Sequence, residues 1–265
     1  MNIRAGKFDV RYELAGDAGL PVVTFVHGLA ASLEIWAGQA ERLSDRFRVL
    51  RYDLRAHGGT TGAGGPCSRH DLAEDLVRLL DALAIERTAL VGHSAGGVVA
   101  QQTAVDFPSR VCALGLVGTA SECNDKTAAW YSRCIEVALA EGGGAVMKLM
   151  GMKPERSPVP DGPGMAPVIA AMRTLNEDPL TSALRAVTVP ATIVVGDKDF
   201  LGVGGSVILS RTIAGSELEI VAGRGHGIYL EDPDWFARKL AEFLERHCAA
   251  ATRVMQSGGE HRDPA

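Results

Sequence analysis

The chain has 265 residues, of which 46% are hydrophobic and 22% are charged, so it can bury a large core and is not a disordered protein. Its formal net charge of −5 argues against a dedicated nucleic-acid-binding protein, which would carry a basic face. No apolar run reaches the roughly 18 residues of a membrane span, and the N-terminus lacks the apolar core of a signal peptide. Five widely spaced cysteines without a CxxC pair indicate reduced thiols, no metal site and a cytoplasmic protein.

The first half of the chain alternates predicted strands and helices. Alternating apolar and polar residues predict an edge strand at Phe8–Leu14. Short apolar runs predict further strands at Val22–Val26, Phe47–Tyr52, Thr88–Val91 and Val111–Val117. Apolar residues at helical spacing predict helices at Leu33–Leu43, His70–Leu83 and Ser94–Phe107. Such alternation is typical of a mostly parallel sheet with helices on both faces.

The strand pattern stops in the middle of the chain. We expect a mostly helical cap over residues 120–186, inserted between core segments 1–119 and 187–248. Its predicted helices are Trp130–Ala140, Gly144–Met150, Ala166–Leu175 and Leu180–Val187, and its proline- and glycine-rich loop is Gly151–Gly164. Alternation resumes with Ala191–Val195, Ser206–Ile213, Glu217–Val221 and Pro233–Glu245. Residues 249–265 are expected to form a disordered tail.

A candidate nucleophile lies in Gly92-His93-Ser94-Ala95-Gly96, which matches G-x-S-x-G between a predicted strand and a predicted helix. In that setting a tight turn places Ser94 at its apex, beside the positive end of the following helix. Gly92 and Gly96 are small, so the strand and the helix can approach each other closely. The alternative is a glycine-rich turn in which the serine only caps the helix. The candidate base, acid and oxyanion donors elsewhere in the chain favour the nucleophile.

A serine nucleophile needs a base, and on this scaffold the chain order is serine, acid, histidine. Three histidines follow Ser94, namely His226, His247 and His261. His226 lies in a glycine-rich loop between a predicted strand and the last predicted helix. His247 ends that helix, and His261 lies in the predicted tail. We therefore predict His226 as the base.

The acid that orients the histidine is expected at the end of a strand that precedes it. Asp199 follows the predicted strand Ala191–Val195 and lies just beyond the turn at the end of this strand. Asp197 lies in the turn itself, where aspartate commonly accepts backbone hydrogen bonds. Glu122, after the strand Val111–Val117, is a further alternative. We predict Asp199 as the acid and keep Asp197 as the competing assignment.

The oxyanion that develops during acyl transfer needs hydrogen-bond donors. His27 and Gly28 follow the first buried strand, and they would turn the backbone so that the N–H of Leu29 points at the nucleophile. With the N–H of Ala95, this amide would form a two-donor oxyanion hole. His27 itself is expected to support the turn and to transfer no proton.

Together these residues resemble the α/β-hydrolase superfamily over residues 22–245. The resemblance rests on five segments in order: FVHGL (Phe25–Leu29), YDLRAHGGT (Tyr52–Thr60), VGHSAGG (Val91–Gly97), VVGDKD (Val194–Asp199) and GRGHG (Gly223–Gly227). It implies an α/β fold with a mostly parallel eight-stranded sheet, an inserted helical cap and a serine–histidine–aspartate triad. Ala56 and Thr60 replace the usual glycine and serine of their loop, and the common proline turn does not follow Asp199.

Within the superfamily, the chain looks most similar to 3-oxoadipate enol-lactonases and related esterases. Trp130-Tyr131-Ser132-Arg133 resembles the A-W-x-x-R segment that opens the lactonase cap, and Leu184–Pro190 resembles the lead-in to the strand that follows the cap. By this resemblance, Trp130 and Arg133 face the substrate pocket, and Arg133 holds a substrate carboxylate. The alternative is a helix face with a packed aromatic ring and a solvated arginine.

These residues predict a serine hydrolase that cleaves a small carboxylic ester or lactone through an acyl-enzyme. We expect a small-molecule substrate, no cofactor or metal, and no nucleic-acid or membrane partner; a homo-oligomer is compatible with the sequence. Two alternatives stay open. The same triad serves carbon–carbon bond hydrolases and cofactor-free haloperoxidases, and plant strigolactone and karrikin receptors share the fold as receptors with vestigial hydrolysis.

Overall fold

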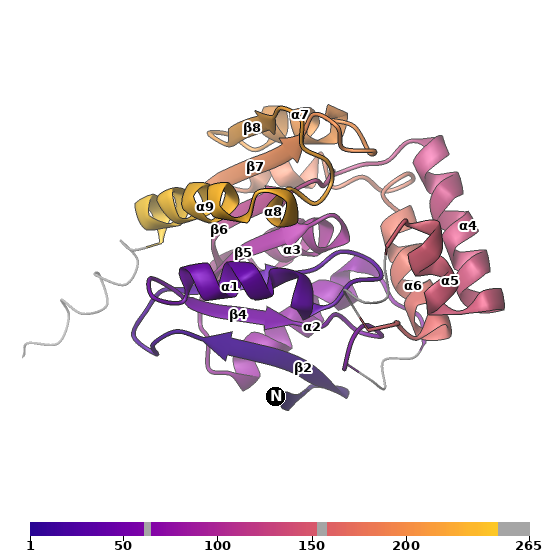
Figure 1. The fold of residues 1–265 in the computed structure, drawn as a ribbon, viewed down its shortest axis with the longest axis horizontal. Helices are drawn as coiled ribbons and strands as arrows, with labels where there is room; N and C mark the ends of the chain where they lie inside the picture. The colour runs from indigo at the N-terminus through magenta and orange to yellow at the C-terminus, as the bar shows by residue number, and fades with distance from the viewer. Residues whose placement is uncertain (61–64, 153–157, 249–265) are drawn as a thin grey trace, which may run out of the picture.

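The computed structural model describes residues 1–60, 65–152 and 158–248, and an eight-stranded sheet forms its centre (Figure 1). The strands are β1 (Asn2–Ala5), β2 (Phe8–Ala15), β3 (Val22–Val26), β4 (Arg48–Tyr52), β5 (Thr88–His93), β6 (Val111–Val117), β7 (Ala191–Gly196) and β8 (Glu217–Val221). Their order is β1-β2-β4-β3-β5-β6-β7-β8, with β1 and β2 antiparallel to their neighbours and the other strands parallel. The predicted mostly parallel, eight-stranded α/β sheet is confirmed.

The strand at the edge of the sheet differs from the prediction. Strand β2 was expected to be the edge, but β1 pairs with it in an antiparallel hairpin. The turn between Ala5 and Phe8 is tight, and Gly6 takes a φ of +69° there. A four-residue strand carries too short an alternating pattern to stand out in the sequence, so β1 depends on its pairing with β2 rather than on its own residues.

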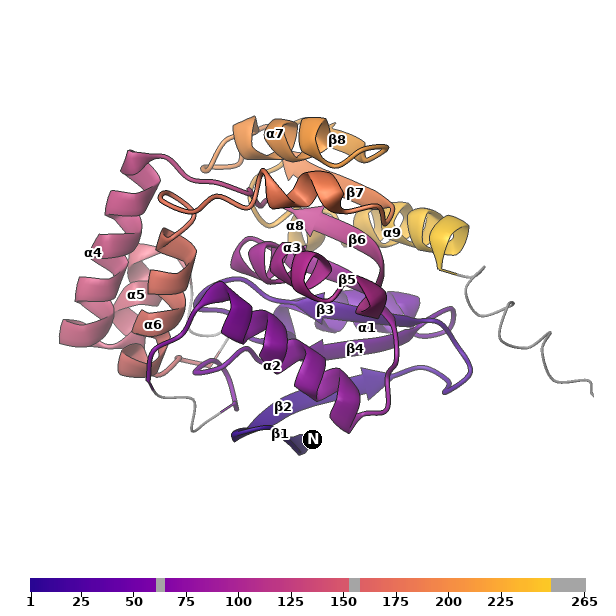
Figure 2. The same cartoon turned by 180° about the vertical axis from the view of Figure 1, so that it is seen from behind.

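Helices cover both faces of the sheet. Helices α1 (Ala37–Leu43) and α9 (Pro233–His247) pack on one face together with the short helix α8 (Ile228–Glu231) (Figure 1). Helices α2 (Arg69–Ala82), α3 (Ala95–Asp106) and α7 (Gly204–Thr212) cover the other face (Figure 2). Each face has its own core, because alternate strand residues point to opposite sides: Val23 and Phe25 pack towards α1 and α9, whereas Val26 packs in the other core.

Local side-chain chemistry sets several helix ends. Helix α2 begins at Arg69 because the Ser68 hydroxyl accepts the Asp71 N–H and the Asp71 carboxylate accepts the Ser68 N–H, which is a capping box. The predicted helix Leu33–Leu43 is divided into a 3₁₀ turn, η1 (Leu33–Trp36), and α1. The predicted helix over residues 180–187 is wrong, since only the 3₁₀ turn η4 (Ala183–Ala186) forms there.

The segment between β6 and β7 is helical and lies at the carboxyl ends of the parallel strands (Figure 1). It contains α4 (Asp125–Glu141), α5 (Gly143–Leu149) and α6 (Gly162–Arg173). The predicted loop over residues 151–164 ends earlier than expected, because Asp161 caps α6 by accepting the Gly164 N–H. The treatment of residues 120–186 as a separate cap domain stays a prediction, and we call α4–α6 the cap below.

Three stretches lie outside the described residues: 61–64 after β4, 153–157 within the predicted cap loop, and 249–265, which is the predicted tail. Among the helices that the structure describes, none is both long enough and apolar enough to cross a membrane.

Candidate active site

Ser94 occupies a strained turn between β5 and α3. Its φ of 53° and ψ of −120° are rare for a residue with a side chain, and such strain is typical of functional turns. A Cβ atom on Gly92 would lie 2.3 Å from the carbonyl oxygen of Gly96, and one on Gly96 would lie 2.2 Å from that of Val26. The flanking glycines are therefore required by close backbone approach. This geometry fits the strand–turn–helix setting expected for a nucleophile.

His226 and Asp199 form a hydrogen-bonded pair. Nδ1 of His226 lies 2.8 Å from Oδ2 of Asp199, whose side chain is 1% exposed. The other carboxylate oxygen of Asp199 accepts the N–H of Leu201 at 2.9 Å, which fixes the orientation of the carboxylate. Because a carboxylate accepts, Nδ1 carries the proton and Nε2 keeps its lone pair. The pair thus offers a base at Nε2.

The two competing acids lie elsewhere. Asp197 accepts the N–H of Gly223 at 2.7 Å and so fastens the turn that precedes the His226 loop. Glu122 accepts a hydrogen bond from the Thr181 hydroxyl at 2.5 Å. The structure thus brings Asp199, rather than Asp197 or Glu122, to His226.

Two buried histidines hold the loop that carries Leu29. Nε2 of His27 accepts the N–H of Leu54 at 3.0 Å, and Nε2 of His57 accepts the N–H of Ala30 at 3.1 Å. Burial lowers the pKa of His27 to about 4 and that of His57 to about 3, so both rings are neutral at pH 7. His27 therefore supports the turn, as its position suggested, and His57 is a second support that the sequence did not single out.

The two predicted oxyanion donors are near the serine. Leu29 and Ser94 line one cavity, and Ala95 is the residue that follows Ser94 at the start of α3. Within the described residues, neither the Leu29 amide nor the Ala95 amide donates a hydrogen bond. The hydrogen bonds that Ser94 makes to described residues all involve its backbone and none involves its hydroxyl; catalytic hydrogen bonds often tighten only when substrate binds.

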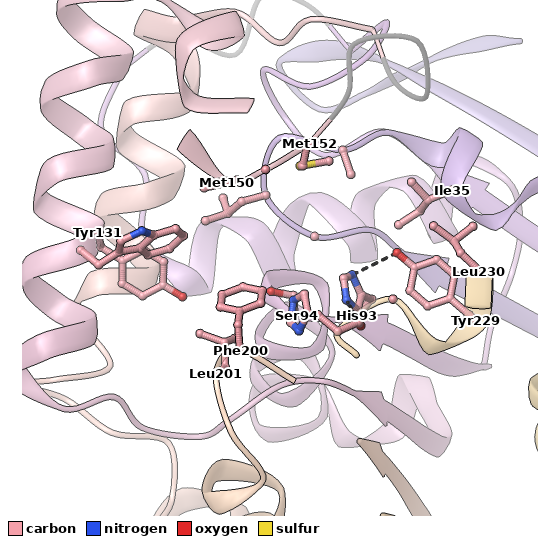
Figure 3. A pocket seen from close by; sticks show the side chains of 17 residues that line it. Ile35, His93, Ser94, Tyr131, Met150, Met152, Phe200, Leu201, Tyr229 and Leu230 are labelled. Atoms are coloured by element: carbon pink, nitrogen blue, oxygen red, sulfur yellow. Dashed lines mark hydrogen bonds between the residues drawn. The ribbon is translucent and has the colours of Figure 1, made fainter. Parts of the chain in front are cut away.

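His93 holds the loop of His226 in place through a hydrogen bond to its backbone. Its Nε2 lies 3.0 Å from the His226 carbonyl oxygen, and the Tyr229 hydroxyl lies 3.4 Å from its Nδ1. A carbonyl can only accept, so Nε2 donates and Nδ1 accepts from Tyr229 (Figure 3). Burial, followed by the repulsion that arises when the His93 and His226 rings are both protonated, lowers the pKa of His93 well below its usual 6.5. His93 is therefore a neutral positioning residue.

A cavity of about 390 Å³ opens above Ser94 and is mostly apolar. Figure 3 shows Tyr131 of the cap on one side of Ser94 and Tyr229 with Leu230 on the other. The lining side chains include Ile35, Trp130, Tyr131, Met150, Met152, Phe200, Leu201 and Leu230. Most of these were not predicted, because irregular cap and loop segments contribute them and their side-chain directions have no signature in the sequence.

Trp130 and Arg133 diverge in the structure. Trp130 lines the cavity, whereas the Arg133 side chain is 61% exposed and pairs with Glu136 at 3.1 Å. Residues three apart on a helix are offset by roughly 60° around its axis, which suffices to turn one side chain to the cavity and the other to solvent. The structure therefore does not bring Arg133 to Ser94; Tyr131, between them, lines the cavity instead.

Known proteins that resemble this chain indicate its class of protein. Residues 21–149 match a family model described as the alpha/beta hydrolase fold. The sheet order, this match and the relatives below show that the chain has the α/β-hydrolase fold and is similar to proteins of that superfamily, and they support a hydrolase. Among the described residues, no group of three or more His, Cys, Asp or Glu side chains could hold a metal ion.

More particular similarities cover between about half and nine-tenths of the chain. A protein of Pantoea ananatis named "Putative carbamate hydrolase RutD" is 27% identical over 90% of this chain and 94% of its own length. The 3-oxoadipate enol-lactonase 2 of Acinetobacter baylyi is 32% identical over 47% of this chain and 46% of its own. The crystal structure of the enol-lactonase from Burkholderia xenovorans LB400 superposes with a TM-score of 0.81 at 25% identity, covering 92% of this chain and 99% of that one. The predicted resemblance to enol-lactonases is confirmed.

Proposed function

We propose that this protein is a serine hydrolase that cleaves a small carboxylic ester or lactone. The observation that carries the proposal is the 2.8 Å contact between His226 Nδ1 and Asp199, beside a cavity that both His226 and the strained Ser94 line. A nucleophile, a base with a free lone pair and an orienting acid are the parts that acyl transfer requires.

The proposed reaction has two halves. Ser94 Oγ attacks the carbonyl carbon while His226 Nε2 takes its proton, and the N–H groups of Leu29 and Ala95 stabilise the oxyanion. The imidazolium then gives its proton to the leaving alkoxide, and the acyl-enzyme forms. Water deacylates Ser94 by the same steps in reverse. Asp199 keeps the His226 ring in the required tautomer and offsets its transient positive charge.

The cavity lining bears on the substrate. Its side chains from the described residues are aromatic, aliphatic or thioether apart from Ser94 and the histidines, so the part of an ester or lactone that occupies this cavity should be uncharged. We do not propose Arg133 as a ligand of a substrate carboxylate, because its guanidinium is exposed and paired with Glu136.

Carbamate hydrolysis is the second candidate. It is favoured by the likeness, over 90% of this chain, to the relative named as a carbamate hydrolase. A carbamate has a carbonyl flanked by a nitrogen, so the same serine, base and oxyanion donors would act on it. The two candidates differ in the acyl group rather than in the catalytic residues.

A substrate panel tests the proposal. Purified protein is assayed with p-nitrophenyl acetate, small lactones, an enol-lactone and an aryl carbamate, alongside Ser94→Ala. We expect many turnovers per protein molecule on an ester or lactone, and a loss of ~10⁴-fold or more in kcat for Ser94→Ala. A single turnover would point to a receptor. Undiminished activity in Ser94→Ala would refute the proposal.

A further inference from the structure

Ser94 lies at the junction of two cavities. The first is the apolar cavity described above. The second, of about 330 Å³, lies between the segment that follows β6 and helix α7. Ser94, Tyr131 and Leu201 line both cavities, so the two meet at the serine. The second is otherwise lined mainly by Val98, Gly118–Ala120, Glu122–Asn124, Thr127, Leu175 and Ile208.

The second cavity differs from the first in carrying a carboxylate. One oxygen of Glu122 accepts the hydrogen bond from Thr181, and no Lys, Arg or His of the described chain forms an ion pair with this carboxylate. The neighbouring polar groups are occupied: the Asn124 side chain accepts the Thr127 N–H at 3.0 Å. An unpaired carboxylate beside a partly enclosed cavity attracts a cation and repels an anion.

The residues that line each cavity indicate which half of an ester enters it. His226 must protonate the leaving oxygen, and Leu29 must donate to the oxyanion; both line the first cavity, and neither lines the second. Of the three groups on the tetrahedral carbon other than Ser94 Oγ, only the acyl substituent needs neither residue. The alcohol half therefore belongs in the first cavity, and the acyl half has the second available to it.

We propose that the second cavity is the acyl-binding subsite and that Glu122 selects acyl groups carrying a positive charge at their far end. This inference rests on the proposed hydrolysis at Ser94. It identifies the preferred substrates as esters that join an apolar or aromatic alcohol to a cationic acid, such as an amino or quaternary ammonium acid.

Two p-nitrophenyl esters of equal shape test the charge preference. One carries the 4-(trimethylammonio)butyryl group and the other the neutral 5,5-dimethylhexanoyl group, and the spontaneous hydrolysis rate of each is subtracted. We expect kcat/KM to be about tenfold higher for the cationic ester than for the neutral one, and the ratio of the two values to fall to about one in Glu122→Gln. Equal values for both esters in the wild-type protein would overturn the charge preference.

A matched pair of isoleucine variants tests the assignment of the two halves. Ile208 lines the second cavity and Ile35 the first. We expect Ile208→Phe to lower kcat/KM at least fivefold more for the long acyl ester than for p-nitrophenyl acetate, and Ile35→Phe to lower it more for esters of large alcohols than for esters of small ones. The opposite pattern would overturn the assignment, and circular dichroism checks that both variants are folded.

The same assays distinguish the acyl-binding subsite from the proposed hydrolase activity. Acetate ester turnover that depends on Ser94, without any acyl preference, would overturn the subsite and leave the proposed function standing. No Ser94-dependent turnover of any ester would overturn both.

Discussion

His27 and His57 each accept a backbone N–H from the loop that carries the other histidine. His27, after β3, accepts from Leu54 after β4, and His57, after β4, accepts from Ala30 after β3. The two rings lie 5.2 Å apart between centroids, and both are about 1% exposed or less. Two neutral imidazoles thus join the loops so that Leu29, between His27 and Ala30, is held in place.

Removing this support should impair catalysis more than substrate binding. We expect His57→Ala to lower kcat about tenfold or more with KM nearly unchanged, because the loop of the proposed oxyanion donor loses an anchor. His57→Gln, whose amide oxygen can accept the Ala30 N–H, should recover part of the loss. His70→Ala is the control, since His70 is exposed and pairs with Asp106 on the surface. Equal kcat values for His57→Ala and His70→Ala would contradict the prediction.

Acid should destabilise the protein through these histidines. Their pKa values in the folded state, about 4 for His27 and about 3 for His57, lie below the 6.5 of an unfolded histidine. Between pH 6.5 and about 4 the unfolded chain therefore binds protons that the folded one excludes, and the free energy of unfolding falls by up to ~1.4 kcal/mol per pH unit for each ring. The effect fades above pH 7, because neither the folded nor the unfolded chain then holds these protons.

Asp75 opposes this trend in part. Burial raises its pKa to about 6 despite its ion pair with Arg55, so from about pH 6 down to about 4 the folded state holds a proton that the unfolded state releases. Urea denaturation at pH 7.5, 6 and 5 measures the net slope. We expect stability to fall from pH 7.5 to 5, and to fall less steeply in His57→Gln. A slope in this variant equal to that of the wild type would count against the assignment.

The acid can be identified with two asparagine variants. Asp199→Asn should lower kcat by ~10³–10⁴-fold: if the amide oxygen keeps the Leu201 N–H, the amide NH₂ faces His226 Nδ1 and favours the wrong tautomer, and the charge that offsets the imidazolium is lost. Asp197→Asn should retain most of the activity, since an amide oxygen can still accept the Gly223 N–H. Steady-state kinetics on p-nitrophenyl acetate compares them. A larger loss for Asp197→Asn would show that Asp197, rather than Asp199, is the acid that orients His226.

There is little space for a side chain at Gly118, because Asp199 and His226 lie directly against it. A Cβ atom there would lie 3.0 Å from Asp199 Oδ2 and 3.1 Å from His226 Nδ1, at a φ of +52°. We expect Gly118→Ala to lower kcat about tenfold or more by displacing the pair. Gly142→Ala is the matched control, because Gly142 also has a positive φ, +84°, but nothing lies within 4 Å of its Cβ position. Equal activities would attribute the effect to backbone strain alone.

Two of the five cysteines are placed to react with each other. Sγ of Cys112, in β6, lies 3.2 Å from Sγ of Cys248, after α9, and both line an open cavity with Arg87. The hydrogen bond from Cys248 lowers the pKa of Cys112, which favours its thiolate. The thiolate would reduce hydrogen peroxide to water and become a sulfenic acid, and the Cys248 thiol would then displace a second water to form a disulfide.

Mild peroxide should therefore lower the number of titratable thiols from five to three in the unfolded, quenched protein. Peptide mapping should find the crosslink between residues 112 and 248. Cys112→Ser should abolish it, whereas Cys134→Ser, which alters a buried cysteine elsewhere, should not. A crosslink that persists in Cys112→Ser would show that other thiols are responsible.

The sequence alone determined the features that neighbouring residues impose on one another. The turn at Ser94 could be predicted because its steric needs are met within Gly92–Gly96, and the buried strands could be predicted because continuous apolar runs have no other stable place than a covered sheet. The serine–acid–histidine order followed from the succession of strands and loops, which is itself a property of the linear chain.

Tertiary structure alone decided the relationships that cross between segments. The choice between Asp197 and Asp199 as the partner of His226 depends on how two loops meet, and the link between His27 and His57 joins residues 30 positions apart. Arg133 turned to solvent because a rotation of roughly 60° around a helix separates neighbours three residues apart, and only packing sets the direction in which each helix face points. Local sequence patterns select the type of each element, whereas side-chain direction and the contacts between loops depend on the way in which the elements pack.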